Sequence, residues 1–333
     1  MDYPSALITG GAGFVGHHLV EHLLLNTDWN LVCLDRLDTS GNLNRLDAVI
    51  GGSADRKERV RFIYHDLKAP ISPTLSQQIG NVDYIFHLAA GTHVDRSITD
   101  PMSFVYDNVV GTGHLLEYAR TIPHVRMINF STDEVFGPAP KHIFFAENDR
   151  YRAGNPYAAT KAGAEQLCLA YHNTYGVNVI ITHCMNIFGE RQHVEKFIPL
   201  CVKRLLSGKE IEIHANKTKK KSGSRFYIHA RNVASAALFI MRKGAPGEMY
   251  NIVGEKEVTN LSLANTIARL LFVPDSRKSL KLIDYHSSRP GHDLRYALDG
   301  TKLAALGWTP QVSFEASLSR TVRWMREHPE WLL

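Results

Sequence analysis

The sequence has few cysteines and no long hydrophobic run, and both absences narrow the classes of protein that it can encode. Its 333 residues include four cysteines, which lie far apart in apolar segments and form no CxxC pair. A disulfide framework or a zinc-thiolate site is therefore not expected, and reduced cysteines favour a cytoplasmic protein. The apolar runs are interrupted by His, Asp or Gly, so we predict no membrane span and no membrane partner.

A strong excess of one charge is also lacking. Thirty-eight Lys and Arg against 33 Asp and Glu give a net charge of +5 with His neutral. A nucleic-acid binder spreads basic residues over a face, so nucleic acid is not an expected partner. Much of the excess gathers in one cluster, Lys217, Lys219, Lys220, Lys221 and Arg225. This cluster is either a solvated loop or lies near an anionic ligand. There is no HExxH motif, and no metal site is predicted.

The first half of the chain alternates between short apolar runs and helical stretches. Predicted strands cover residues 6–9, 30–34, 60–64, 82–88, 125–130 and 177–183, and the main predicted helices cover 13–25, 103–120 and 156–175. This order is typical of an α/β protein whose doubly wound parallel sheet carries helices on both faces. The second half has shorter elements, and Gly and Pro interrupt it more often. It predicts a smaller α/β lobe.

A glycine-rich segment links the first strand to the first helix. The segment TGGAGFVG at 9–16 places Gly10, Gly13 and Gly16 in the spacing GxxGxxG. Such glycines allow a tight turn and let the backbone and a helix N-terminus approach a pyrophosphate. The second strand ends at Asp35, 19 residues after Gly16, where a carboxylate binds both ribose hydroxyls of an adenosine. We therefore expect a Rossmann-type domain that prefers NAD to NADP, although the adjacent Arg36 favours the opposite choice.

Two further patterns carry chemistry, and each also has a purely structural interpretation. Tyr157 and Lys161 are four residues apart in YAATK, and a nearby ammonium group favours a tyrosinate that can act as a base. Such a spacing is usually a surface pair, but the small residues that follow it favour close packing. The segment STDEVFG at 131–137 follows an apolar strand and places Thr132, Asp133 and Glu134 over the ligand crevice. The alternative is a strand-terminating turn that Thr132 or Asp133 caps.

In combination, TGGAGFVG, STDEVFG and YAATK resemble the extended short-chain dehydrogenase/reductase superfamily. Within it the sequence is most similar to the nucleotide-sugar 4,6-dehydratases, particularly those acting on dTDP-glucose. The resemblance runs nearly end to end and includes HLAA at 87–90, HVDRS at 93–97, NVVGT at 108–112, EKFIP at 195–199 and RPGHD at 289–293. It implies a Rossmann domain over 1–186, with returns to the sheet near 225–253, and a lobe over 187–333 that mainly binds the nucleotide sugar.

The resemblance also implies a reaction. Tyr157 takes the proton of the 4-hydroxyl while hydride passes to NAD, with Lys161 favouring the tyrosinate and Thr132 contacting the 4-oxygen. Glu134 then removes the proton of carbon 5, which the 4-ketone has made acidic. Asp133 protonates the departing 6-hydroxyl, and hydride returns to carbon 6. A homodimer that pairs helices 103–120 and 156–175 across a two-fold axis is implied as well.

Binding residues follow from the same resemblance. The cofactor residues implied are Gly10, Gly11, Gly13, Phe14, Val15, Gly16, Asp35, Arg36, Asp38, Asp66, Leu67, Leu88, Ala89, Ala90, Thr92, Asn108, Tyr157 and Lys161. The substrate residues implied are Thr92, Thr132, Asn186, Lys196, Phe197, Arg225, Asn260, Arg289 and His292. Phe197 could instead be a core residue, and Asn260 could instead cap a helix over 261–271.

The chain departs from the family pattern at two places. Gly91 stands where the family usually has a glutamate, and 214–224 is lysine-rich where a Gly-Asp-Gly turn is usual. The resemblance implies a pyrimidine nucleotide. Because the second place lies near the expected nucleotide site, the choice between thymine and uracil and the identity of the sugar stay open. A 4-epimerase or decarboxylase on the same scaffold and a non-catalytic NAD-binding protein are the alternatives. The pair Asp133 and Glu134 argues against the epimerase.

Overall fold

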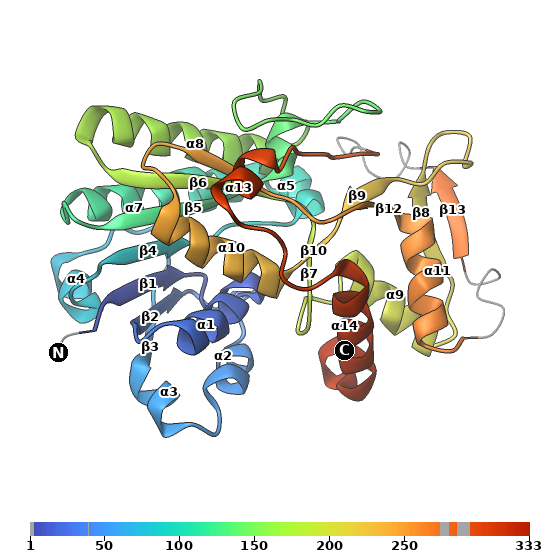
Figure 1. The fold of residues 1–333 in the computed structure, drawn as a ribbon, viewed down its shortest axis with the longest axis horizontal. Helices are drawn as coiled ribbons and strands as arrows, with labels where there is room; N and C mark the ends of the chain where they lie inside the picture. Colours follow the sequence, from blue (N-terminus) through green and yellow to red (C-terminus); the bar gives the residue numbers. More distant parts are fainter. Residues whose placement is uncertain (1–2, 39, 274–279, 285–293) are drawn as a thin grey trace.

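A parallel seven-stranded sheet forms the centre of the larger lobe (Figure 1). The computed structural model describes residues 3–38, 40–273, 280–284 and 294–333. The strand order is β11-β6-β5-β4-β1-β2-β3, and the strands are β1 (Ser5–Thr9), β2 (Asn30–Asp35), β3 (Val60–Tyr64), β4 (Tyr84–His87), β5 (Arg126–Thr132), β6 (Asn178–Cys184) and β11 (Met249–Ile252). The order reverses direction at β1, which makes a doubly wound sheet with its ligand crevice at the carboxyl ends. The predicted fold class is confirmed.

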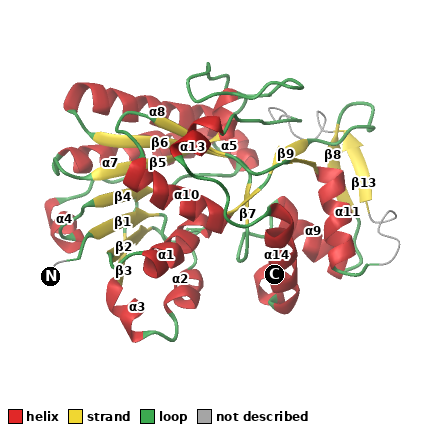
Figure 2. Ribbon diagram, in the orientation of Figure 1, coloured by secondary structure: helices red, strands yellow, loops and turns green. Residues whose placement is uncertain are grey.

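Alternate residues of the central strands face two separate apolar cores, which explains why these strands are mainly apolar. In β1, Ala6 and Ile8 pack into one core, whereas Leu7 packs into the other. Helices α1 (Phe14–Asn26), α2 (Leu43–Ile50) and α10 (Ala230–Lys243) complete the first core, and α4 (Pro73–Ile79), α7 (Gly111–Arg120) and α8 (Pro156–Tyr175) complete the second. Figure 2 shows helices on both sides of the sheet. A strand buried on both faces has no solvent side to carry polar residues.

The helix predicted over 103–120 begins earlier and is not a continuous α-helix. It starts with α6 (Pro101–Phe104), where the Asp100 side chain accepts a hydrogen bond from the Ser103 amide. A π-helical turn, η1 (Val105–Val110), follows before α7, and the Gly111 amide donates to the Tyr106 carbonyl five residues back. A π turn holds one more residue than an α turn and therefore changes where the following side chains point.

The remaining elements build a smaller lobe beside the carboxyl edge of the sheet (Figure 1). Helices α9 (Phe197–Leu206), α11 (Asn260–Leu270) and α14 (Phe314–Glu327) share an apolar core with β8 (Ile211–Ala215), which pairs with β13 (Leu280–Asp284). Two short pairs connect this lobe to the sheet, β7 (Ile187–Phe188) with β10 (Ile228–His229) and β9 (Ser224–Phe226) with β12 (Glu257–Thr259).

The minor elements of the described chain complete the architecture. They are α3 (Ala54–Arg59), α5 (Val94–Thr99), η2 (Asp133–Phe136), α13 (Thr301–Leu306) and η4 (Pro329–Leu332). Strand β11 pairs with β6 although residues 185–248, which include the lobe elements β8 and α9 as well as α10, separate them in sequence. The division into 1–186 and 187–333 stays a prediction. Over the described residues, no helix has the length and apolarity needed to cross a membrane.

Candidate active site

The glycine-rich turn after β1 forms a cradle that side chains would fill. Gly10 has a φ of +73°, and a Cβ there would lie 2.8 Å from the Ala89 amide nitrogen. A Cβ on Gly16 would lie 2.1 Å from the Gly10 carbonyl oxygen, so α1 packs against the turn only because residue 16 is glycine. Gly13 is the N-cap of α1 and gives no side-chain cap. The first amides of this helix therefore face the cavity as donors for an anion, which fits a pyrophosphate.

Asp35 lies at the carboxyl end of β2, beside this turn. Its carboxylate accepts hydrogen bonds from the Ala12 amide at 3.1 Å and from the Leu37 amide at 2.9 Å. These amides hold the carboxylate at the rim while it keeps further acceptor capacity for hydroxyl groups. Burial raises the pKa of Asp35, and the two amide bonds oppose that shift.

Twenty of the predicted site residues line one cavity of about 330 Å³ along the carboxyl edge of the sheet. They are Gly10, Gly13, Phe14, Val15, Gly16, Asp35, Arg36, Asp38, Asp66, Leu67, Leu88, Ala89, Ala90, Thr92, Thr132, Asp133, Glu134, Tyr157, Asn186 and Lys196. The structure therefore places the glycine turn, the strand-end carboxylate and the reactive residues around a single space, as an elongated dinucleotide with a sugar at one end requires.

Three predicted cofactor residues lie behind the cavity wall. Gly11 packs against β2, since a Cβ there would lie 2.8 Å from the Cys33 Cβ. Asn108 is buried; its amide oxygen accepts from the Gly91 amide at 2.8 Å, and its Nδ2 donates to the Gly91 carbonyl and to Thr160. Lys161 is also buried. These residues shape the wall, and the described contacts give Gly11 and Asn108 a structural role.

Thr132, Asp133 and Glu134 form a compact group where β5 ends and η2 begins. The Thr132 hydroxyl donates to Asp133 Oδ1 at 3.1 Å and accepts from the Glu134 amide at 3.3 Å. Thr132 is therefore the N-cap of η2, and it lines the cavity at the same time. The Asn155 side chain donates to Glu134 Oε2 at 3.0 Å, which fixes the direction of that carboxylate.

The two acids differ in their surroundings. Asp133 is almost fully buried, and its Oδ2 has no hydrogen-bond partner within the described structure. Burial, followed by the nearby charge of Glu134, raises the pKa of Asp133 to about 7. A carboxyl group with such a pKa is protonated in half of the molecules near neutral pH, so it can donate a proton. Asp133 therefore keeps a proton that it can donate at neutral pH.

Tyr157 and Lys161 lie in the first turns of α8, which begins after the Asn155 cap. The Asn155 side chain accepts from the Ala158 amide at 2.9 Å, and the Tyr157 amide donates to Ser97 Oγ at 3.1 Å. Burial, with the charge of Glu134, raises the pKa of Tyr157 above its usual value. Burial also lowers the pKa of Lys161, while the Glu165 carboxylate opposes that change. Nearby positive charge, from Lys161 and from the oxidised nicotinamide ring of a bound dinucleotide, would favour the tyrosinate.

A buried polar network supports this region from behind. Glu165 is on α8, four residues after Lys161, and is bonded to Ser131 and Tyr151. It also lies 3.0 Å from His183 Nε2, and His183 Nδ1 lies 2.9 Å from Asn251 Oδ1 on β11. The network connects α8 with three neighbouring strands and leaves the Glu165 carboxylate well partnered although it is fully buried.

A second cavity of about 270 Å³ adjoins the first and extends into the smaller lobe. Six residues line both cavities: Thr92, Glu134, Asn186, Ile187, Gln192 and Lys196. The predicted substrate residues Phe197, Arg225 and Asn260 line only the second. The Arg225 guanidinium donates to the Leu294 carbonyl at 2.8 Å and stacks over Tyr296 at 4.5 Å. This cavity would suit a charged nucleotide next to the reactive end of the first.

Several sequence interpretations can now be compared with the structure. Phe197 lines the second cavity and also packs at the edge of the lobe core. The alternative that Asn260 caps a helix is wrong. Thr259 caps α11, because its side chain accepts a hydrogen bond from the Ser262 amide at 3.1 Å. Asn260 Oδ1 instead accepts a hydrogen bond from the Tyr227 hydroxyl at 3.0 Å. The lysine cluster 217–221 is exposed and lines neither cavity. Arg289 and His292 lie outside the described residues.

Sequence reasoning missed several residues of the first cavity, including Arg45, Lys68 and Asp107. Arg45 is buried in α2 and donates to the Ala12 carbonyl at 3.3 Å and to the Arg191 carbonyl at 3.1 Å. Asp107 directly precedes the NVVGT segment, and this adjacency was its only signal. Both reach the cavity from elements remote in sequence, so no local pattern marks them.

Comparison with known proteins agrees with this site. The family model described as GDP-mannose 4,6 dehydratase matches residues 7–321. The chain belongs to this family. It is 36% identical over 350 residues to the dTDP-glucose 4,6-dehydratase of Escherichia coli, a match that covers 98% of this chain and 94% of the relative.

Solved structures show the same relationship. The dTDP-glucose 4,6-dehydratase DesIV of Streptomyces venezuelae, solved with NAD bound, is 37% identical with a TM-score of 0.88, and the match covers 98% of both chains. A UDP-glucose 4-epimerase of Thermus thermophilus, also solved with NAD, is 26% identical with a TM-score of 0.84, and the match covers 97% of this chain and 99% of the other. Dehydratases and epimerases therefore share this scaffold, and the chemistry must be assigned from the site residues.

Proposed function

We propose that this chain is an NAD-dependent nucleotide-sugar 4,6-dehydratase, which converts a nucleoside-diphosphate hexose to its 4-keto-6-deoxy product. The observation that carries the proposal is Asp133: a buried carboxyl group with a pKa near 7, adjacent to Glu134 and facing the same cavity as Tyr157. An elimination needs an acid and a base at one place, and this pair supplies both. A 4-epimerase eliminates no water, so it would have no use for the adjacent acids Asp133 and Glu134.

The residues divide the work as follows. NAD, held by the glycine turn and Asp35, would supply the hydride acceptor for carbon 4 and the hydride donor for carbon 6. The Tyr157 oxygen takes the proton of the 4-hydroxyl, and the buried Lys161 favours this by its charge. Thr132 orients the 4-oxygen. A Glu134 carboxylate oxygen removes the proton of carbon 5, and Asp133 delivers its proton to the leaving 6-hydroxyl as water departs. Glu134 returns its proton to carbon 5 when hydride reaches carbon 6, and Asp133 then regains a proton from solvent while Tyr157 releases one. The redox change cancels over the cycle, so one NAD serves many turnovers.

The test is a product assay with dTDP-glucose and UDP-glucose. The expected product has lost one water from its hexose, which mass spectrometry detects, and carries a 4-ketone. Purified protein should also release NAD on denaturation. An epimerised hexose of unchanged mass would support the epimerase alternative, and bound NAD without turnover on any nucleotide sugar would support a non-catalytic protein.

We expect the nucleotide part of the substrate to contain a pyrimidine base. Binding of dTDP and UDP to the NAD-loaded protein should both be measurable, because one methyl group discriminates by only about 10–200-fold. The exposed lysine cluster 217–221 cannot select a base, since exposed charge acts over about 8–10 Å at physiological salt. If GDP bound more tightly than either pyrimidine nucleotide, the assignment of the base would be wrong.

We further infer a cytoplasmic homodimer. The four free cysteines are buried, as suits a reducing compartment. Met102 and Tyr106 expose apolar surface on the segment that precedes α7, beside α8, and a second copy of this chain would cover it. Sedimentation at micromolar concentration should give a dimer, and a charge at Met102 should shift it toward monomer. A wild-type monomer would contradict the inference.

A further inference from the structure

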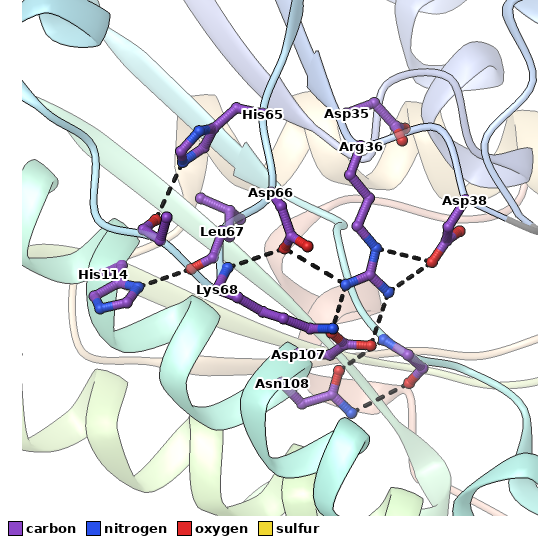
Figure 3. Close-up of polar contacts among 12 residues, drawn as sticks. Asp35, Arg36, Asp38, His65, Asp66, Leu67, Lys68, Asp107, Asn108 and His114 are labelled. Atoms are coloured by element: carbon purple, nitrogen blue, oxygen red, sulfur yellow. Dashed lines mark hydrogen bonds and ion pairs between the residues drawn. The ribbon is translucent and has the colours of Figure 1, made fainter. Parts of the chain in front are cut away.

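Arg36, the residue after the ribose-binding carboxylate of Asp35, is fully occupied by three other carboxylates (Figure 3). Its Nε donates to Asp38 at 2.8 Å, and its Nη2 donates to Asp38 at 2.6 Å and to Asp107 at 2.8 Å. Its Nη1 donates to Asp107 at 2.5 Å and to Asp66 at 3.5 Å. A guanidinium group has five N–H donors, and here every one of them is directed at a carboxylate.

The position of Arg36 connects these hydrogen bonds with the choice between NAD and NADP. An arginine at the carboxyl end of the second strand is placed to accept the 2′-phosphate that distinguishes NADP from NAD. Arg36 lines the same cavity as Asp35 and the glycine turn. If its donors were available, Arg36 would work against the NAD preference that Asp35 sets.

Among the three carboxylates, Asp107 fixes the Arg36 guanidinium group most firmly. It comes from the π-helical turn η1, and its side chain is only 6% exposed, whereas that of Asp38 is 40% exposed. The missing side chain of Gly91 makes room for it, because a Cβ there would lie 3.2 Å from Asp107 Oδ2. Two parallel bonds to a buried carboxylate fix the plane of the guanidinium group more firmly than an exposed partner does.

The charges around Arg36 also disfavour the 2′-phosphate of NADP. Lys68 lies 3.4 Å from Asp107 and is the second cation of the group. Four carboxylates, those of Asp35, Asp38, Asp66 and Asp107, line the cavity together with the three cations Arg36, Lys68 and Arg45, which leaves a formal charge of −1. A 2′-phosphate brings about −1.5 to −2 more, so it would meet both repulsion and an arginine whose donors are already engaged.

We propose that Asp107, by holding the Arg36 guanidinium, is a positioning residue that determines cofactor specificity and excludes NADP from this protein. The inference rests on the proposed function in one respect, namely that the cavity holds a nicotinamide dinucleotide. According to this proposal, Asp107 and Arg36 contribute to the discrimination between NAD and NADP, which Asp35 alone would otherwise provide.

The test measures binding and does not depend on turnover. Full-length wild type, Asp107→Asn, Arg36→Gln and the double variant are equilibrated with an equal mixture of NAD and NADP until the bound ratio is constant. Bound cofactor is released by denaturation and quantified by chromatography. Asp107→Asn should raise the bound NADP-to-NAD ratio about tenfold or more, because the freed guanidinium can donate charge-assisted bonds to the 2′-phosphate. Asp55→Asn, which neutralises an exposed acid outside the cavity lining, should leave the ratio unchanged.

The double variant decides the mechanism. If Arg36 receives the phosphate, adding Arg36→Gln to Asp107→Asn should remove most of the gain. A gain that persists in the double variant would overturn the role of Arg36, and an unchanged ratio in Asp107→Asn would overturn the whole inference. Should Asp107→Asn fail to fold, Asp38→Asn tests the same contact from the exposed side and should raise the ratio a few-fold. Wild type that holds neither cofactor would instead refute the proposed function.

Discussion

Replacing Asp133 with asparagine should remove the dehydration activity and at the same time stabilise the protein at alkaline pH. The folded protein holds the pKa of this carboxyl near 7, against 3.8 as the ordinary value. Between these values the folded state keeps a proton that the unfolded state has lost, so stability falls as pH rises. A difference of about three pKa units corresponds to about 4 kcal/mol once the pH exceeds 7. Asparagine, which carries no charge at any of these pH values, avoids this cost.

The pH dependence of the effect gives the sharper measurement. The cost grows by about 1.4 kcal/mol per pH unit up to pH 7, so the stability gain of Asp133→Asn should increase by about 2 kcal/mol between pH 5.5 and pH 8. Urea unfolding of both proteins at the two pH values, with NAD saturating, measures this. Asp55→Asn, which alters an exposed carboxylate, should show no such trend. A gain that is the same at both pH values would refute the assignment of Asp133 as the buried acid.

The remaining predictions concern three other residues. Tyr157→Phe should abolish the first oxidation, so that substrate produces no NADH absorbance; a wild-type signal would contradict its role as base. Glu134→Gln should still form NADH on adding substrate but should dehydrate on the order of 10²-fold more slowly or worse, and a wild-type rate of water loss would show the role to be misassigned. Gly16→Ala should purify with much less bound NAD, since its Cβ would lie 2.1 Å from the Gly10 carbonyl, whereas Gly113→Ala meets only a Leu167 methyl at 3.9 Å and should bind normally.

Local patterns predicted those elements whose signals lie within a few residues. The bounds of the helix 156–175 agree with the structure to the residue, because Asn155 and Pro156 start it and Gly176, with a φ of +70°, ends it. The central strands are recognisable because both of their faces are buried and each is therefore mainly apolar. The alternative that made Asn260 the cap of α11 is off by one residue, since Thr259 and Asn260 are both good capping residues and only the backbone distinguishes them.

Features that depend on distant contacts could not be predicted in this way. The sequence did not predict the π turn at η1, because the apolar residues of this segment fit an α-helix equally well. The bond between Arg36 and Asp107 joins residues 71 positions apart. The pKa of Asp133 is raised mainly because its carboxyl group is buried. That burial depends on the packing of side chains from several distant elements, which a local sequence pattern does not reveal. Motifs therefore predicted the candidate catalytic residues, and only the fold showed what surrounds them.

Strand β11 has a consequence for how the chain acquires its structure during synthesis. The edge of β6 stays unpaired until Met249–Ile252 leaves the ribosome, and the α1 face of the sheet stays uncovered until Val233, Ala236 and Ile240 of α10 arrive. A nascent chain released near residue 186 would thus expose a parallel edge and an apolar surface together, the combination that most readily aggregates. A stop codon or a protease cut at that point should give insoluble material, whereas co-expression of 187–333 should restore solubility by supplying the missing strand and helix.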